Sequence, residues 1–399
     1  MKTVLVYFTL LGLFSAVQIT VNKKNEFSFD PDITRNVSDL ILSKGYPVEN
    51  HVVRTKDGYL LSVQRIPHGK GGEKIPNKQA VFIQHGLLSS SSDWVINFPE
   101  QSLGFILADA GYDVWLGNCR GNTYSRRHVK YTPDMEVFWD YSFDQLAEYD
   151  FPAMIDYVLK ETGEEQLFYI GHSQGTTGAF AMLSESLEYN KKIKLFVALA
   201  PVTTVGHITS AVKYLAPFTT EIEFLFEILG VKDFAPSDAL MKYFSEYVCD
   251  TEAKFLCEYV MYLVFGADLQ QLNTTRLGVY TAHTPAGSSV KSIVHYAQLV
   301  LSKKFTKFDY RKNNVIHYNQ TTPPEYDVSK ITAPVALLWA LGDTLADPDD
   351  VVVLQSKLKS LVSSYCVPLP SFNHNDFVQA LDANRLVYDE VMRLLKEFE

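Results

Sequence analysis

Short apolar runs separated by amphipathic segments recur through the first half of the chain. Asp57-Gly58 lies between two alternating runs, 51–55 and 59–66, which predicts an antiparallel hairpin. Strands that alternate with helices predict right-handed crossovers and a mainly parallel sheet with helices on both faces. The expected strands after the hairpin lie at residues 80–84, 113–117, 167–170 and 195–200, and the expected helices at 101–110, at 143–160 and directly after residue 173.

The alternation stops after Pro201. Residues 203–328 are rich in aromatic side chains and helix-like runs, and a strand returns only at 333–339. The pattern predicts an α/β core, residues 19–202 and 329–399, interrupted by a mostly helical insertion. Ordinary core packing accounts for most of the aromatic residues. The alternative is a cap whose apolar inner face lines a substrate pocket.

The first residues resemble a secretory signal peptide, predicted at 1–18. Lys2 precedes an apolar run at residues 4–14, and the small residues Ser15 and Ala16 follow. A membrane anchor is the alternative, but the run has about ten residues, whereas a bilayer span needs about 20. We expect an exported chain without a transmembrane segment. The formal net charge of −10 and the lack of a basic stripe argue against a nucleic-acid partner.

Export changes the interpretation of the four cysteines. Cys249 and Cys257 are eight residues apart and could form a local disulfide in an oxidising compartment. Cys119 and Cys366 are distant and are expected to be buried thiols, although four cysteines allow three pairings. No Cys/His cluster has zinc spacing, so no metal site is predicted. Three N-x-[ST] sequons are candidate glycosylation sites, at Asn36, Asn273 and Asn319.

The strand-like run at 167–170 ends in Gly171-His172-Ser173-Gln174-Gly175. This G-x-S-x-G pattern is typical of a nucleophile elbow, a sharp strand-to-helix turn that exposes the serine hydroxyl. Glycines two residues before and after the serine let strand and helix approach closely. Five-residue patterns also arise by chance, but the strand before it and the helix after it favour Ser173 as a nucleophile.

A serine nucleophile needs a base to take its proton and a group that orients the base. In a fold with such an elbow, the acid and then the histidine follow the serine. His374 is the one histidine beyond the returning strand, and it is the predicted base. Asp343 directly follows that strand and is the predicted acid, with Asp347 as the second choice. Asp347, Asp349 and Asp350 cluster at an apparent helix start, where capping explains them.

The negative charge that develops on the substrate oxygen requires backbone N–H donors. One is expected from Gln174, the residue after the nucleophile, and the other from Leu87, in the loop after the strand at 80–84. Gly86 would let this loop turn inward. His85 precedes the serine and is predicted to be structural.

Several ordered motifs together resemble the acid lipases, a family that includes gastric lipase and lysosomal acid lipase. The resemblance runs from about residue 36 to the C-terminus. It implies an α/β-hydrolase core and a helical cap that carries a lid and a disulfide matching Cys249 and Cys257. It also assigns the nucleophile to Ser173, the acid to Asp343 and the base to His374, with Leu87 and Gln174 as oxyanion donors. The motifs are Gln84-His85-Gly86-Leu87-Leu88, residues 108–118, Gly171-His172-Ser173-Gln174-Gly175-Thr176-Thr177, Thr284-Pro285-Ala286-Gly287-Ser288-Ser289 and Leu345-Ala346-Asp347-Pro348.

The resemblance implies a serine carboxylic-ester hydrolase that cleaves triacylglycerols, cholesteryl esters or both at a lipid–water interface through an acyl-enzyme. No cofactor is expected. The family name suggests work at low pH, and the signal peptide directs the chain to the extracellular or gut lumen or to the lysosome. Two alternatives are an esterase or thioesterase for small soluble substrates and a lipid carrier that has lost its chemistry.

Overall fold

The computed structural model describes residues 30–72, 79–218, 233, 245–249, 254–268 and 270–399. The predicted signal peptide lies outside the described residues. Within the described ranges, no helix combines the length and the apolar character that a membrane crossing requires.

The described strands form one nine-stranded sheet in the order β1-β2-β4-β3-β6-β7-β8-β9, with β5 paired to β2. All pairs from β4 to β9 are parallel, and those made by β2 are antiparallel. The predicted mainly parallel sheet and its hairpin are therefore confirmed. The strands are β1 Glu49–Arg54, β2 Tyr59–Ile66, β3 Ala80–Gln84, β4 Asp113–Gly117, β5 Arg127–His128, β6 Leu167–His172, β7 Ile193–Leu199, β8 Val335–Trp339 and β9 Leu361–Cys366.

The burial of each strand explains whether the sequence pattern predicted it. Every residue of β3, β4 and β6 is buried, as expected for central parallel strands covered on both faces. The edge strand β9, with the sequence LVSSYC, alternates between half-buried and exposed positions over most of its length. It has no continuous apolar run, so the sequence pattern does not mark it.

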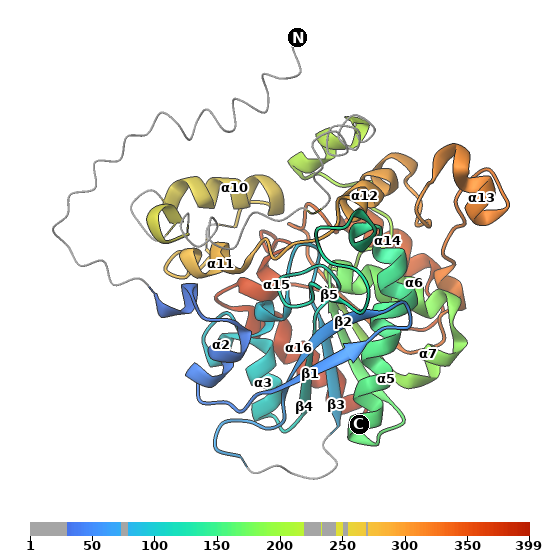
Figure 1. Cartoon of the computed structure of the whole chain (residues 1–399). Coiled ribbons are helices and arrows are strands. Elements are labelled where there is room, and N and C mark those ends of the chain that lie inside the picture. Colours follow the sequence, from blue (N-terminus) through green and yellow to red (C-terminus); the bar gives the residue numbers. More distant parts are fainter. Residues whose placement is uncertain (1–29, 73–78, 219–232, 234–244, 250–253, 269) are drawn as a thin grey trace.

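Helices cover both faces of the sheet, with α3 and α16 on one face and α5, α6 and α14 on the other (Figure 1). The predicted helix at 143–160 is divided, because a π-helical turn, Leu146–Asp150, leads into α5 and Pro152 occupies the first turn of α5. The core helices are α2 Val37–Ser43, α3 Leu103–Asp109, α4 Phe143–Gln145, α5 Phe151–Thr162, α6 Gln174–Glu185, α7 Leu187–Lys192, α14 Pro348–Lys357, α15 Asp376–Gln379 and, after a π turn at Asn384–Tyr388, α16 Asp389–Glu397.

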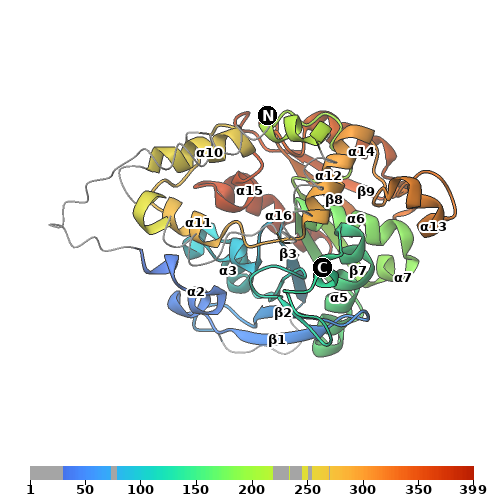
Figure 2. The same ribbon diagram turned by 45° about the horizontal axis from the view of Figure 1, so that its top comes forward.

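We call the described residues of the 203–328 segment the cap. They are helical, as predicted, and contain isolated bridges but no named strand. The end points of this segment stay a prediction. Helices α10 and α11 lie beside each other, and α12 lies nearer to α6 and α14, in both views (Figures 1 and 2). The cap elements are η6 Ala211–Phe218, η7 Ser245–Cys249, α10 Phe255–Phe265, α11 Leu277–His283, α12 Val290–Ser302 and α13 Asn314–Tyr318.

The expected disulfide is present and joins Cys249 of η7 to Cys257 of α10. Cys119 is a buried free thiol, as predicted. The expected burial of Cys366 is wrong, because this residue ends the edge strand β9 and stays partly exposed.

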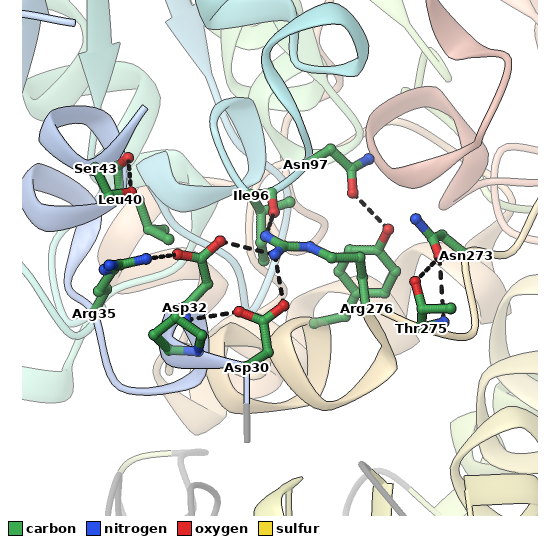
Figure 3. Close-up of polar contacts among 12 residues, drawn as sticks. Asp30, Asp32, Arg35, Leu40, Ser43, Ile96, Asn97, Asn273, Thr275 and Arg276 are labelled. Atoms are coloured by element: carbon green, nitrogen blue, oxygen red, sulfur yellow. Dashed lines mark hydrogen bonds and ion pairs between the residues drawn. The ribbon is translucent and has the colours of Figure 1, made fainter. Parts of the chain in front are cut away.

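A buried arginine fastens the cap to the N-terminal segment (Figure 3). Arg276, at the start of α11, donates from one terminal nitrogen to Asp30 at 2.9 Å and to Asp32 at 2.8 Å. Its other terminal nitrogen donates to the carbonyl of Ile96. Arg276 is 2% exposed, so these contacts replace water around a fully buried charge. We call this set of contacts the arginine junction.

Candidate active site

Ser173 lies in the sharp turn between β6 and α6. Its φ of 52° and ψ of −118° are unusual for a residue with a side chain, and its N–H donates to the carbonyl of Leu199 at 3.1 Å. The two glycines of the motif allow this turn. A Cβ on Gly175 would lie 2.4 Å from the carbonyl oxygen of Gln84, and one on Gly171 would lie 2.8 Å from the backbone of Gly175.

The structure brings Ser173, His374 and Asp343 together in a hydrogen-bonded chain. The Ser173 hydroxyl lies 2.8 Å from Nε2 of His374, and Nδ1 of His374 lies 2.9 Å from Oδ2 and 3.0 Å from Oδ1 of Asp343. A carboxylate accepts, so the proton belongs on Nδ1, and Nε2 is left free to accept from the serine. Asp343 and His374 are 2% and 3% exposed, so water does not compete for the two inner contacts.

The geometry separates the four candidate aspartates. Oδ1 of Asp343 accepts from the N–H groups of Leu345 and Ala346 at 2.9 and 2.8 Å, which orients its carboxylate toward His374. Asp347 caps α14 through the N–H of Asp349 at 3.0 Å and does not contact the histidine. Asp349 and Asp350 belong to the first turn of the same helix.

The loop that follows β3 lies directly against Ser173. A Cβ on Gly86 would be 3.1 Å from Cβ of Ser173, so a side chain at this position would crowd the serine. Within the described part of the chain, neither the Leu87 N–H nor the Gln174 N–H donates to a protein acceptor. Both N–H groups are therefore available to an oxygen placed beside Ser173.

The cap holds this same loop in place, which the sequence did not indicate. Leu88 has a φ of 61°, a left-handed conformation that is costly for leucine. Its carbonyl accepts from the N–H of Ala286 in the cap at 2.6 Å, and the Ala286 carbonyl accepts from the N–H of Thr123 at 2.8 Å. The strained turn thus has a partner on the cap.

His85 has the structural environment that its position predicts. Its Nε2 accepts from the N–H of Cys119 and from the side-chain amide of Asn122, both at 3.2 Å, while Nδ1 donates to the Gly86 carbonyl. Burial lowers its pKa to about 4, so it stays neutral.

His172, the first variable residue of the G-x-S-x-G motif, makes a contact that the sequence did not predict. Its Nε2 donates to the carbonyl of His374 at 2.9 Å, so the elbow also fixes the backbone of His374. Burial and then the nearby His374 lower the pKa of His172 to about 3, which keeps it an uncharged donor. The pattern G-x-S-x-G leaves this position open, and no signal in the sequence identifies its partner.

Comparison with known proteins agrees with this geometry. The family model for the alpha/beta hydrolase fold matches residues 79–381, and a partial alpha/beta-hydrolase lipase region matches residues 37–98. Gastric triacylglycerol lipase from Bos taurus is 46% identical over 92% of this chain and 93% of the bovine protein. This chain belongs to the acid lipase family of α/β-hydrolases. Lysosomal acid lipase/cholesteryl ester hydrolase from Homo sapiens is 42% identical, with 93% of each chain covered.

Solved structures agree on the architecture of this acid lipase family member. A presumed lipase from Sulfolobus solfataricus superposes with a TM-score of 0.57 over 88% of this chain and 99% of its own. A presumed lipase from Acinetobacter baumannii superposes with a TM-score of 0.55 over 94% of this chain and 99% of its own. Both are 14% identical to this chain, so the likeness shows the fold alone. The predicted α/β-hydrolase fold is confirmed.

Proposed function

We propose that this chain is a lipase that hydrolyses the carboxylic esters of lipids through an acyl-enzyme on Ser173. The observation that carries the proposal is the continuous chain of contacts from the Ser173 hydroxyl through the His374 imidazole to the Asp343 carboxylate. Its relatives are named for triacylglycerol and cholesteryl ester hydrolysis, which supports lipid esters as the substrate class.

In the first half-reaction, Ser173 attacks the ester carbonyl while Nε2 of His374 takes the hydroxyl proton. Asp343 keeps the Nδ1–H tautomer and stabilises the imidazolium that forms. The N–H groups of Leu87 and Gln174 donate to the oxyanion. The imidazolium then gives its proton to the leaving alcohol as the carbon–oxygen bond breaks.

In the second half-reaction, the neutral imidazole takes a proton from water, and the resulting hydroxide attacks the acyl carbon. The tetrahedral intermediate collapses, the Ser173 oxygen regains its proton from His374, and a fatty acid leaves. In both half-reactions, the unprotonated Nε2 of His374 is the proton acceptor.

We also propose that the cap meets the lipid surface. Large apolar side chains are exposed on two cap elements that contact each other, η6 and α10. An exposed apolar patch on a soluble surface marks an interaction site. Those on η6 include Tyr214, at 69% exposed, and Leu215, at 59%, and those on α10 include Phe255, at 60%, and Tyr259, at 63%.

The first test is Ser173→Ala, with folding checked by circular dichroism. We expect hydrolysis of a triglyceride emulsion to fall by about 10⁴-fold or more, because the covalent step is lost. Asp343→Asn should lower kcat by on the order of 10³–10⁴-fold, since the amide favours the wrong tautomer. Asp347→Asn is the matched control and should keep its activity. Loss of activity in the Asp347 variant alone would contradict the choice of acid.

A substrate panel distinguishes the finer possibilities. Triglycerides, cholesteryl esters and a short soluble ester should be compared across pH, as emulsions and in solution. Leu215→Ser and Tyr259→Ser should weaken activity on emulsions and leave the soluble ester unaffected. Ile316→Ser is the control, because Ile316 is 81% exposed and belongs to α13, which lies apart from α10 (Figure 1). Equal activity on soluble and emulsified esters would favour a simple esterase.

We further propose export to the extracellular space or the lysosome, with glycans on two of the three sequons. Asn36 and Asn319 are exposed. Asn273 is 8% exposed, and its side-chain oxygen accepts from the N–H and the hydroxyl of Thr275 (Figure 3). Removal of N-glycans followed by peptide mass analysis should find modified Asn36 and Asn319 and an unmodified Asn273.

A further inference from the structure

The loop that carries His374 is bound to the cap through several side chains. Ser371 donates from its hydroxyl to Oδ2 of Asp268 at 3.0 Å, and the Asn373 side-chain amide donates to the carbonyl of Gly266 at 2.9 Å. Asp268 and Gly266 follow the end of α10. The ring of Phe265, its last residue, lies nearly parallel to the His374 imidazole, at an angle of 6°.

A further contact of this loop with the cap involves a pair of carboxyl groups, those of Asp376 and Asp268. Oδ2 of Asp376 accepts from the N–H of Asn373 at 2.7 Å, which closes the loop around His374. The Asp376 carboxyl lies beside the carboxyl of Asp268, and both residues line one small cavity. Oδ1 of Asp268 accepts from the N–H groups of Gln270 and Gln271 at 3.0 and 3.3 Å, so Asp268 is held as the acceptor. A hydrogen bond between two carboxyl groups needs a proton, and Asp376 is the group placed to carry it.

The surroundings of Asp376 favour its protonated form. Burial raises its pKa to about 8, the carboxylates of Asp268 and Asp343 act in the same direction, and the Asn373 N–H opposes them. Asp376 is 4% exposed. The other titratable groups facing this region are Tyr262 on α10, His374 on the loop itself, Asp93 on the η2 turn that packs against α15, and Asp382 after α15.

We propose that Asp376, as a carboxylic acid donating to the Asp268 carboxylate, is a positioning residue that holds the His374 loop against the cap. The role rests on the proposed function, because it matters for catalysis only if His374 is the base. While the pair shares its proton, the Asn373 N–H contact and the Asp268 contact hold both ends of the loop segment. When both groups ionise, two buried carboxylates repel each other and the segment separates from the cap.

A small cavity beside the pair makes this separation possible. Tyr262, Asp268, Asn373 and Asp376 line it together with other residues of α10 and the loop. Water that enters here can solvate the ionised carboxylates once they part. His374 would then lose its alignment with Ser173.

Two isosteric variants test the pair. In Asp376→Asn, the amide nitrogen can donate to Asp268 at every pH while the amide oxygen still accepts from the Asn373 N–H. In Asp268→Asn, the new amide donates to the ionised Asp376, so the direction of the hydrogen bond is reversed. This second variant still tests the pair if the first variant does not fold. Asp327→Asn is the charge control, because it removes one exposed carboxylate. Asp93→Asn is the buried control, since burial raises the pKa of Asp93 to about 7.

The measurement is amide hydrogen exchange in residues 371–376 of the full chain at pH 6 and pH 9, corrected for intrinsic exchange, alongside a pH–activity profile. At pH 9, one unit above the pKa, roughly nine in ten wild-type molecules carry the ionised pair. We expect wild-type exchange at pH 9 to be about tenfold faster than in Asp376→Asn, and equal exchange at pH 6. The alkaline limb of the pH–activity profile should shift to higher pH in both pair variants and should not shift in either control.

Equal protection of the segment in the wild type and in both pair variants at pH 9 would overturn the proposal. If the pair variants protect the segment at pH 9 but do not shift the alkaline limb of the pH–activity profile, the positioning role is wrong. The role is also wrong if only Asp93→Asn shifts that limb. If the wild type hydrolyses no ester, the proposed function fails, and hydrogen exchange alone still decides whether the pair binds the loop.

Discussion

The cap is joined to the core at two buried acidic clusters that work in opposite ways. At the arginine junction, Arg276 faces Asp30 and Asp32 (Figure 3). Lys44 also donates to Asp32, at 2.8 Å. At the carboxyl pair, Asp376 faces another carboxyl group, that of Asp268. Burial is common to both places. The partner decides whether the acid stays ionised or keeps its proton.

The difference gives the two joints opposite responses to pH. Burial raises the pKa of Asp32, but hydrogen bonds from Lys44, Arg35 and Arg276 outweigh it, and the pKa falls from 3.8 to about 2. A depressed pKa gives stability that is present above about pH 4 and lost as the pH falls through 2. The raised pKa of Asp376 gives stability that is full below about pH 4 and lost as the pH rises through 8. Both joints therefore hold in mildly acidic conditions.

The largest effect on stability is expected from Arg276→Met, which keeps most of the volume and removes the charge. Asp30 and Asp32 each lose a charged partner, and we expect a loss of about 3 kcal/mol in urea unfolding. Asp32→Asn combined with Arg276→Met should recover part of this loss. Arg393→Met is the control at an exposed arginine, for which about 0–1 kcal/mol is expected. A tolerated Arg276→Met would mean that the arginine junction does not hold the cap.

The pH dependence of thermal unfolding separates the two joints more finely. Asp32→Asn should lower Tm at pH 7 and have little effect at pH 2, where the wild-type group is already becoming protonated. Asp376→Asn should change Tm little at pH 4 and raise it at pH 9. Shifts of roughly 2–4 °C are expected for each kcal/mol. Shifts of the same sign in both variants at pH 9 would contradict the contrast between the joints.

A small effect is expected from Ser371→Ala at the carboxyl pair. The variant removes the hydroxyl donor to Asp268 but leaves the shared proton, so we expect a loss of about 1 kcal/mol and an unmoved alkaline limb. Thr332→Ala, in a loop away from the pair, serves as a matched control. A large shift of the alkaline limb in Ser371→Ala would mean that the hydroxyl, and not the proton, binds the loop.

The sequence predicted those parts of the fold that depend on residues close together in the chain. The buried strands and the elbow around Ser173 are continuous runs, and each carries its own signal of apolar residues and glycines. Strand β9 was missed because its side chains alternate at an exposed edge. Of the four aspartates after β8, Asp343 follows the strand end and contacts His374, while Asp347 caps α14, as their positions in the sequence suggested.

The joints of the cap could not be predicted, because their partners are far apart in the chain. Arg276 meets Asp30 across 246 residues, and Ser371 meets Asp268 across 103. A lone arginine or aspartate carries no pattern that names its partner. The same holds for the contact of Ala286 with the strained Leu88, which exists only once cap and core have assembled.

The most direct test of the account is covalent labelling of the nucleophile. The full chain is treated with a long-chain alkyl phosphonate p-nitrophenyl ester, and the labelled peptide is identified by mass spectrometry. We predict one phosphonyl group per chain, attached to Ser173, with no labelling of Ser173→Ala and with loss of ester hydrolysis in step with labelling. A label on another residue, or full labelling of the Ser173→Ala chain, would contradict the account.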